Sequence, residues 1–257
     1  MRSALVACAS TLVVAVLLVF VVTRSPGWPR VRETFLSPED FRAASPQVLE
    51  GLWLNVQIFL IAEPLILALG LPIAVARSVR APVFLPLRVL GTAYVDLFRG
   101  LPAILVIFVV GFGAPALRLR GVPTDPVVLG VIALVLTYSA YVAEVFRAGI
   151  ESVEHGQRAA ARSLGLTHVQ ELRYVVLPQA VRRVVPPLLN DFVSLQKDTA
   201  LVAVIGPLEA MRQAQVYASG TFNYTAYLAA ALLFVLLTIP MARLTDALTA
   251  RTARKRR

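Results

Sequence analysis

The sequence predicts an all-α polytopic membrane protein with about six transmembrane helices. Its 257 residues are 58% hydrophobic, and the mean hydropathy is +0.73. The apolar runs are long enough to cross a bilayer at about 1.5 Å per residue. The basic residues lie between these runs, as expected for loops on the cytoplasmic side of a membrane. The net charge of +10 therefore does not indicate a nucleic-acid-binding protein.

The composition argues against an enzyme. Cys8 is the only cysteine, and both histidines, His155 and His168, lie in one loop, which is no ligand set for a metal. The chain contains no G-x-x-x-x-G-K-[ST], G-x-S-x-G or H-E-x-x-H motif. We therefore expect no catalytic residues, no metal site and no cofactor on this chain.

The first apolar run, residues 4–22, is long enough to span a bilayer. A cleaved signal peptide would have a shorter apolar core, and Val22-Thr23-Arg24 offers no small-x-small cleavage site. Residues 1–23 are therefore predicted to form an N-terminal transmembrane anchor. Residues 24–47 are polar and contain four prolines, which predicts an extracytoplasmic segment.

A five-helix core is predicted over residues 48–246, followed by a basic cytoplasmic tail, 247–257. Residues 101–112 are too short to cross alone, so their span should begin near Leu90, with Arg99 near the cytoplasmic end or against protein. Arg77, Arg80 and Arg88 are expected in the preceding loop. The predicted core spans are 52–75, 90–112, 127–146, 184–205 and 224–244.

The basic residues predict an orientation. With the N-terminus inside, 17 arginines and lysines fall in cytoplasmic segments and 7 in outer segments, with Lys197 inside a span. This bias places both termini, and the central loop at residues 147–178, in the cytoplasm.

The central loop carries signals for two short helices. Ala159, Ala160 and Ala161 favour a helix that Gly165 can close, because glycine accepts a left-handed conformation. Thr167 is then expected to cap a second helix, with Gln170 completing a capping box. Pro178 should end or kink that second helix.

The spacing of this loop resembles the EAA loop of binding-protein-dependent ABC importer permeases. The matching pattern is Ala160-Ala161, three residues, Gly165, nine residues, Val175, one residue and Leu177-Pro178. The resemblance implies that the loop docks into a groove on a cytoplasmic ATPase. The family's glutamate falls at Ala159, so any salt bridge it would make to the ATPase is missing. The implied coupling residues are Gly156, Arg158, Ala159, Ala160, Ala161, Arg162, Gly165, Leu177 and Pro178.

Three more segments resemble the polar-amino-acid branch of these permeases, and with the loop they extend the match over about residues 51–244. They are 143–150 (AEVFRAGI), 177–182 (LPQAVR) and 197–201 (KDTAL). The resemblance implies a permease subunit that imports polar amino acids, or close analogues, across a bacterial or archaeal inner membrane. The implied partners are a solute-binding protein, a second permease copy or paralogue, and an ATPase dimer that holds ATP and Mg.

Polar residues inside spans are costly and need an explanation. Asn190, Ser194 and Lys197 are spaced i, i+4 and i+7, and Asp191, Ser194 and Asp198 are spaced i, i+3 and i+7, so both sets share one broad helix face. Asn190, Asp191 and Ser194 are candidates for lining a substrate path. For Lys197 and Asp198 we favour a structural role, pairing with neighbouring helices.

Other polar residues allow two interpretations. Glu63 lies in the middle of its span. Either it faces the path, or it is protonated or paired against another helix, and we favour this latter interpretation. Tyr138 and Ser139 lie in mid-span and are candidates for lining the path. Glu144 is one helical turn from Arg147 and is expected to pair with it.

A different class of protein is also considered. An ion-coupled secondary transporter or channel would use Glu63, Asp191 and Asp198 as ion or proton sites. It would leave the capped cytoplasmic loop without a role.

Overall fold

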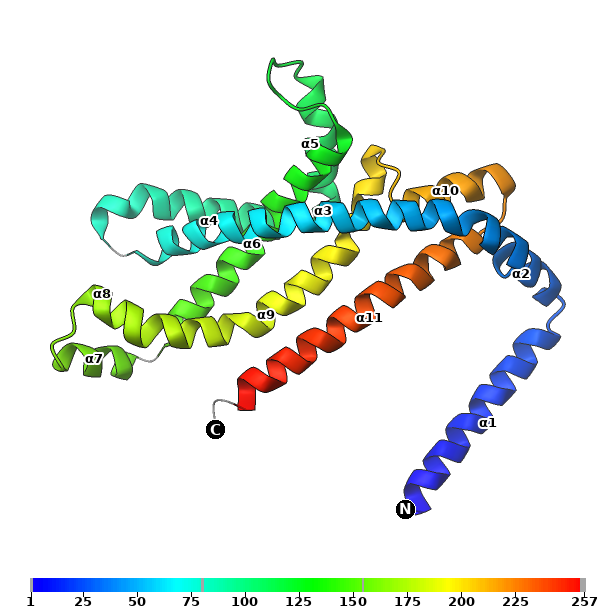
Figure 1. The fold of residues 1–257 in the computed structure, drawn as a ribbon, viewed down its shortest axis with the longest axis horizontal. Helices are drawn as coiled ribbons and strands as arrows, with labels where there is room; N and C mark the ends of the chain where they lie inside the picture. Colours follow the sequence, from blue (N-terminus) through cyan, green and yellow to red (C-terminus); the bar gives the residue numbers. More distant parts are fainter. Residues whose placement is uncertain (1, 80, 154, 255–257) are drawn as a thin grey trace.

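A computed structural model describes residues 2–79, 81–153 and 155–254, which fold into helices joined by short turns (Figure 1). The α-helices are α1 (Arg2–Arg24), α2 (Trp28–Phe35), α3 (Pro38–Ser78), α4 (Leu85–Gly100), α5 (Ala103–Ala116), α6 (Pro126–Glu151), α7 (His155–Ser163), α8 (His168–Glu171), α9 (Leu177–Asp198), α10 (Ala210–Thr221) and α11 (Thr225–Arg254). Shorter segments are the 3₁₀ helices Pro82–Phe84 and Thr199–Ile205 and the π-helix Leu172–Val176.

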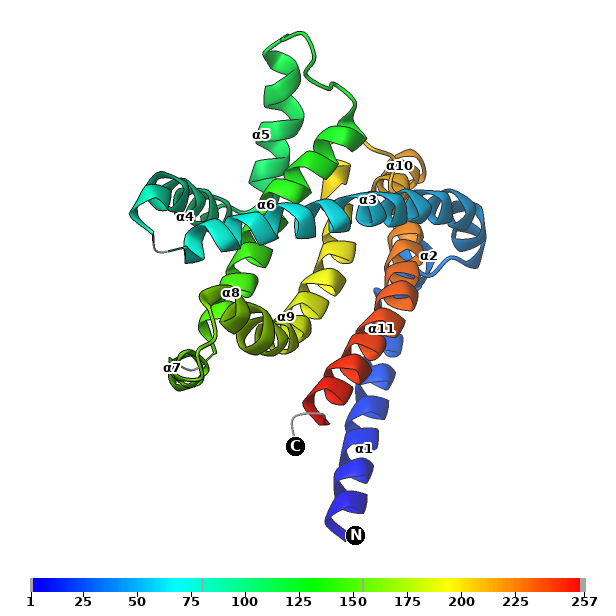
Figure 2. The same cartoon turned by 60° about the vertical axis from the view of Figure 1, so that its left-hand side comes forward.

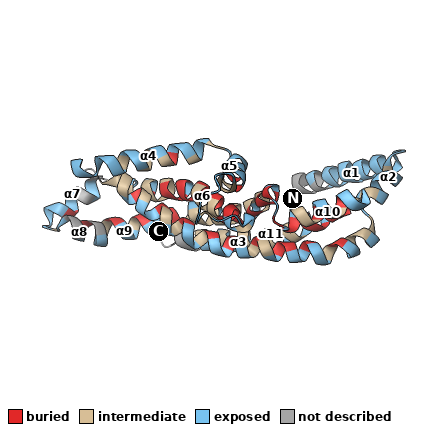
Figure 3. Cartoon of the chain, turned by 90° about the horizontal axis from the view of Figure 1, so that it is seen from above, coloured by how far each residue is buried: buried red, intermediate tan, exposed pale blue. Residues whose placement is uncertain are grey.

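Helix α1 stands apart from the core, and the described part of it is exposed (Figures 1 and 3). The polar segment 24–47 is not an open linker, because it contains α2 and the first part of α3. The end of α2 is attached to the start of α11. The Tyr224 N–H donates to Thr34 O at 2.8 Å, and the Phe35 and Tyr224 rings stack with centroids 5.3 Å apart.

Helix α3 is much longer than the predicted span 52–75. Ser37 caps it by accepting a hydrogen bond from the Asp40 N–H, and Pro38 occupies its first turn, where proline is tolerated. The helix continues through Ser78, so Arg77 lies in its last turn. The prediction that Arg77 and Arg88 lie in a loop was wrong, since Arg88 lies within α4. Arg80 is outside the described residues.

The single span predicted over 90–112 is a broken helix pair. Helices α4 and α5 meet at Leu101 and Pro102 with a bend of 104° (Figure 2). The ring of Pro102 forces Leu101 into an extended conformation, with ψ of 139°, so α4 cannot continue. The second half, α5, begins at the half-buried Ala103.

The core lies where α3, α5, α6 and α9 meet (Figure 3). Its fully buried side chains include Ile58, Ile66, Ile107, Leu134 and Leu195. Lipid tails are as apolar as these side chains, so within a membrane close packing holds the helices together, and small residues allow it.

Glycines on α6 let two neighbouring segments approach closely. A Cβ added at Gly149 would lie 2.1 Å from Val184 Cγ1 of α9, and one added at Gly130 would lie 2.3 Å from Val202 Cγ1. Both approaches are too short for any side chain at these positions. The C-terminal end of α6 is thereby held against α9, next to the central loop.

Three helical stretches of the described chain are long and apolar enough to cross a membrane: Trp28–Ser78, Pro126–Glu151 and Thr225–Ala250. The bent α4–α5 pair makes a fourth if it counts as one span. The span predicted at 184–205 is instead α9, which begins earlier, ends at Asp198 and is too polar to count by hydropathy. The last helix, α11, extends beyond the predicted end at Leu244.

Candidate functional site

The first helix of the central loop ends as predicted at Gly165, which has φ of +80°. The Gly165 N–H donates to Arg162 O at 2.9 Å and the Leu166 N–H to Ala161 O at 3.2 Å, which is the Schellman arrangement. A residue with a side chain would be strained at this φ. The glycine therefore sets the turn between α7 and α8.

The second helix begins with the predicted capping box. The Thr167 N–H donates to Gln170 Oε1 at 2.9 Å, and the Gln170 N–H donates to Thr167 Oγ1 at 3.3 Å. These two bonds satisfy amide groups that a helix start leaves without partners. Helix α8 accordingly starts at His168.

Pro178 does not end the second helix as predicted. The chain passes from α8 through the π-helical residues 172–176 directly into α9, whose first turn contains Pro178. Proline is accommodated there because a first-turn residue needs no amide donor. The departure from α-helical geometry lies one turn before Pro178, where residues 172–176 form a wider π turn.

The loop presents an apolar surface to solvent. Leu164 is 83% exposed and Tyr174 is 62% exposed, and Ala159 and Ala160 of α7 are also exposed. Leu177 and Pro178 are exposed where α9 begins, and Gly156 is exposed on α7. The Arg158 side chain lies outside the described part of the chain.

Two predicted coupling residues hold the loop together. Ala161 is buried, and the Arg162 Nε lies 3.4 Å from Glu171 Oε2. The Glu171 side chain is nearly buried, so its pairing with Arg162 ties α7 to α8. The charge of Arg162 therefore already has a partner within the loop.

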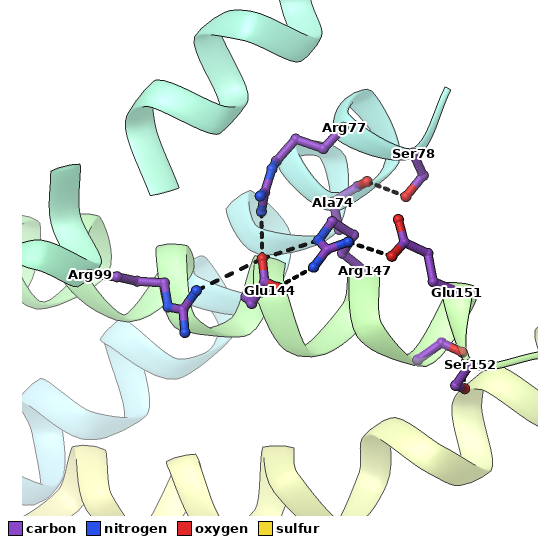
Figure 4. Close-up of polar contacts among 9 residues, drawn as sticks. Ala74, Arg77, Ser78, Arg99, Glu144, Arg147, Glu151 and Ser152 are labelled. Atoms are coloured by element: carbon purple, nitrogen blue, oxygen red, sulfur yellow. Dashed lines mark hydrogen bonds and ion pairs between the residues drawn. The ribbon is translucent and has the colours of Figure 1, made fainter. Parts of the chain in front are cut away.

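A cluster of charged residues joins three helices beside the loop (Figure 4). Glu144 of α6 pairs with Arg147 on the same helix, as predicted, and Arg147 also pairs with Glu151. The sequence did not reveal two further partners. Arg77 Nη1 of α3 lies 2.8 Å from Glu144 Oε2, and Arg99 Nη1 of α4 lies 3.9 Å from it.

A cavity of about 250 Å³ lies between α5, α6 and α9. It brings together the predicted path residues Tyr138, Asp191 and Ser194, and it adds Asp198. The Tyr138 hydroxyl donates to Asp198 Oδ2 at 2.7 Å, which fits the structural role expected for Asp198. The lining residues are Ala103, Thr137, Tyr138, Tyr141, Asp191, Ser194 and Asp198.

Sequence reasoning missed Thr137 and Tyr141. A second cleft of about 360 Å³ shares Tyr141 and Asp191 with the first cavity and extends to Glu144 and Arg99. The Arg99 guanidinium carbon lies 5.8 Å from the centre of the Tyr141 ring. The two hollows therefore lead from the middle of α9 to the charged cluster.

Three predicted path residues do not line the cavity. Ser139 is buried on another side of α6, where its hydroxyl lies 2.7 Å from the Tyr94 hydroxyl and is also bonded to Leu136 O. Asn190 is exposed on α9. Glu63 is half-buried on α3 and interacts electrostatically with Asp191. Lys197, expected to have a structural role, is likewise exposed on α9.

A cluster of buried polar residues that the sequence did not predict lies where α3 meets α10. Asn55 Nδ2 donates to Thr199 Oγ1 and to Glu209 Oε2, both at 3.0 Å, and the Ala210 N–H donates to Asn55 Oδ1 at 3.1 Å. Glu209 caps α10 by accepting from the Arg212 N–H at 2.6 Å. Burial raises the pKa of the Glu209 carboxyl, and these hydrogen bonds oppose the shift.

Among the described residues, no three His, Cys, Asp or Glu side chains are grouped to hold a metal ion. The cavity lining itself offers hydroxyl groups, carboxylates and backbone amides.

Comparison with known proteins gives consistent matches. The family described as "Binding-protein-dependent transport system inner membrane component" matches residues 67–254. The "Probable glutamine ABC transporter permease protein GlnM" of Bacillus subtilis is 42% identical over 184 residues, or 71% of this chain and 84% of that protein. The "Arginine transport system permease protein ArtQ" of the same organism is 35% identical over 188 residues, or 72% and 84%.

A solved structure also matches. The "Crystal structure of an amino acid ABC transporter with histidines" contains a chain that is 32% identical to this one. The match covers 80% of this chain and 94% of that chain, with a TM-score of 0.73.

Proposed function

We propose a working arrangement for this chain, which belongs to the family of binding-protein-dependent transport system inner membrane components and is the permease subunit of an ABC importer for polar amino acids. A solute-binding protein delivers the amino acid at the outer face. The amino acid then passes along α9, and an ATPase dimer carrying ATP and Mg drives the cycle from the cytoplasm. The family match and the relatives favour this function over an ion-coupled transporter.

The path is proposed to follow the polar face of α9, and the cavity beside that face carries the proposal. Asp191, Ser194 and Asp198 face the cavity with Tyr138, and Asn190 and Lys197 are exposed on the same helix. A charged or amide side chain that faces lipid is costly. A second permease copy, identical or paralogous, therefore covers this face and completes the path.

The central loop is proposed to dock on the ATPase. Leu164 and Tyr174 are largely exposed on a segment that the basic-residue bias places in the cytoplasm. Ala159 and Ala160 leave room for close approach of a partner surface. Because Ala159 replaces the family's glutamate, this docking depends on apolar contact at that position. Both chain ends are proposed to be cytoplasmic as well.

Co-purification tests the arrangement. The tagged chain, solubilised from its native host in mild detergent, should bring down an ATPase, and membranes should take up polar amino acids in an ATP-dependent manner. Leu164→Asp should reduce the co-purified ATPase by about tenfold or more, because a buried unpaired carboxylate is costly. Gly165→Pro should abolish uptake, because proline cannot adopt the φ of +80° found there.

Leu119→Asp is the matched control, because Leu119 is 59% exposed in the loop between α5 and α6, on the opposite side of the membrane. It should leave ATPase binding unchanged. Wild-type protein that purifies without an ATPase, or Leu164→Asp that binds it normally, would contradict the proposed coupling.

A further inference from the structure

We propose that α2 and the first turns of α3 and α11 form a binding site for one phospholipid whose headgroup carries both a phosphate and a protonated amine. The headgroup lies in a polar hollow beside α2, and one acyl chain lies in an apolar groove along α11. The inference goes beyond the proposed transport function, because this site is separate from the substrate path.

Two adjoining hollows lie where α2 meets the starts of α3 and α11 (Figure 1). The polar hollow has a volume of about 630 Å³ and is lined by α2, the start of α3 and the turn between them. The apolar groove has a volume of about 390 Å³ and also contacts α11. Four residues line both hollows: Leu36, Ser37, Pro38 and Arg42. One ligand can therefore occupy both.

The apolar groove belongs to a surface that faces lipid. Leu228 and Leu232 line it, and they are exposed one turn apart on α11, a helix long and apolar enough to span a membrane. Phe35 and Phe41 line its other side. Exposed apolar side chains that adjoin one another on a membrane-spanning helix are expected to contact acyl chains.

Aromatic residues place the polar hollow at the level of the lipid headgroups. Trp28 lines the hollow, and the Tyr224 ring, which stacks on Phe35, also stacks on the Tyr227 ring with centroids 6.3 Å apart. Tryptophan and tyrosine gather at membrane interfaces because their rings are amphipathic. The apolar stretch of α11 begins at the same level, at Thr225, so the groove runs from the headgroups into the bilayer.

Four charged residues line the polar hollow, and their charges cancel: Arg32, Glu33, Glu39 and Arg42. None of the four side chains forms an ion pair or a hydrogen bond with another described residue. A neutral lining with separate positive and negative groups is complementary to a zwitterion rather than to a ligand with net negative charge. The hollow therefore fits a phosphate joined to a protonated amine.

The position of Arg42 assigns the phosphate. Arginine can bind phosphate oxygens with two parallel N–H groups, and Arg42 lines both the polar hollow and the apolar groove. In a phospholipid the phosphate likewise lies between the acyl chains and the amine. Glu33 and Glu39 line only the polar hollow, which is where the amine falls.

Hydrogen bonds hold the walls of the site in place. The Ser37 N–H donates to Thr225 Oγ1 at 3.1 Å, which joins the start of α3 to α11. Asn223 Nδ2 donates to Glu33 O at 2.9 Å and to Asp40 Oδ2 at 2.8 Å, which joins α2 to α3. A site formed before its ligand arrives loses less conformational freedom on binding.

Native mass spectrometry of the full-length chain, purified in mild detergent, tests the site. The probes are phosphatidylethanolamine, phosphatidylcholine and phosphatidylglycerol with identical acyl chains. Phosphatidylethanolamine should bind about tenfold more tightly than either of the others. The quaternary amine of phosphatidylcholine has no N–H to donate to a glutamate, and phosphatidylglycerol carries no positive charge.

Two charge variants separate the phosphate from the amine. Arg42→Gln should weaken binding of all three lipids about tenfold, because each contains the phosphate. Its control is Arg30→Gln, since Arg30 is exposed on α2 and lines neither hollow. Glu39→Gln should reduce only the preference for phosphatidylethanolamine. Its control is Glu50→Gln, which changes an exposed acid on α3 outside the site.

A third variant tests the groove. Leu228→Trp should fill the groove and weaken binding of all three lipids about tenfold, because the acyl chain loses its contacts there. Leu236→Trp places the same residue two turns further along α11, outside the groove, and should leave lipid binding unchanged. Circular dichroism should show the same helical content in all variants.

Each outcome supports or overturns the site. Equal binding of the three lipids would overturn the assignment of the amine, and unchanged binding by Arg42→Gln would overturn that of the phosphate. Lipid binding that none of the variants alters would place the lipid elsewhere on the bilayer-facing surface. A chain that binds no lipid would overturn the site altogether. Uptake is not measured in these experiments, so the proposed transport function is tested separately.

Discussion

Two groups of buried polar residues differ in how completely they are hydrogen-bonded. Around Asn55, the amide oxygen, the amide nitrogen and both Glu209 carboxylate oxygens have partners. Around the cavity, Thr137 Oγ1 and Asp191 Oδ2 have none among the described residues. The Asn55 group contacts Thr199 of the 3₁₀ helix that follows α9, and the cavity is lined by α9 itself.

We interpret this difference as separating residues that hold helices together from residues that a ligand can contact. A fully bonded polar group fixes the helices that contribute to it, and losing one member leaves the others without partners. A group with free donors and acceptors costs stability, and a ligand can restore the missing bonds. The Asn55 group should therefore control stability, and the cavity should control transport.

The largest effect on stability is expected from Asn55→Leu. The substitution removes both donors that face Thr199 and Glu209, and should lower the free energy of unfolding by about 1–3 kcal/mol. Thermal unfolding of the detergent-solubilised protein measures this. Gln47→Leu, which removes an amide from an exposed position of the same helix, should change stability by less than about 0.5 kcal/mol. Equal destabilisation by both variants would contradict the structural role of Asn55.

Asp191→Asn should show the opposite pattern. Uptake of polar amino acids should fall about tenfold or more, because a charged hydrogen bond to the substrate is lost. The thermal midpoint should not fall, because the carboxylate oxygen Oδ2 has no partner to lose. Asp246→Asn on α11 is the control, since Asp246 is largely exposed and should affect neither measurement. A lower midpoint for Asp191→Asn would remove the distinction between the two groups.

A smaller effect should appear in the pH dependence of stability. Burial raises the pKa of Glu209 above its ordinary value of 4.5, so the folded protein binds this proton more tightly than the unfolded chain. The resulting stabilisation is fully present below the unfolded pKa and is lost as pH rises through the folded pKa. The thermal midpoint of the wild type relative to Glu209→Gln should therefore rise as pH falls from 7 toward 4.5. A constant difference between the two midpoints would show that Glu209 does not titrate in this range.

The features predicted correctly from sequence depend on near neighbours. The capping box of Thr167 and Gln170 and the turn at Gly165 involve residues within five positions of each other, so a short stretch of sequence contains all the information. The break at Leu101 had a signal too, because Pro102 restricts the residue before it. The length of the apolar run concealed that signal.

The features missed depend on distant residues. Arg147 was found as a partner of Glu144 because it lies one turn away, whereas Arg77 and Arg99 come from α3 and α4. On α6, neighbouring positions differ by about 100° around the helix axis. Ser139 therefore faces Tyr94 while Thr137 and Tyr138 reach the cavity, and hydropathy alone could not choose among them.

The π turn at residues 172–176 has a mechanical consequence. It holds one residue more than an α-helical turn, so everything before it is rotated by about 100° relative to an unbroken helix. The direction in which α8 faces, relative to Asp191 of α9, is thus set by a single extra residue. A rotation of α8 would be transmitted to α9 through this widened turn, because the turn is the only covalent connection between the two helices.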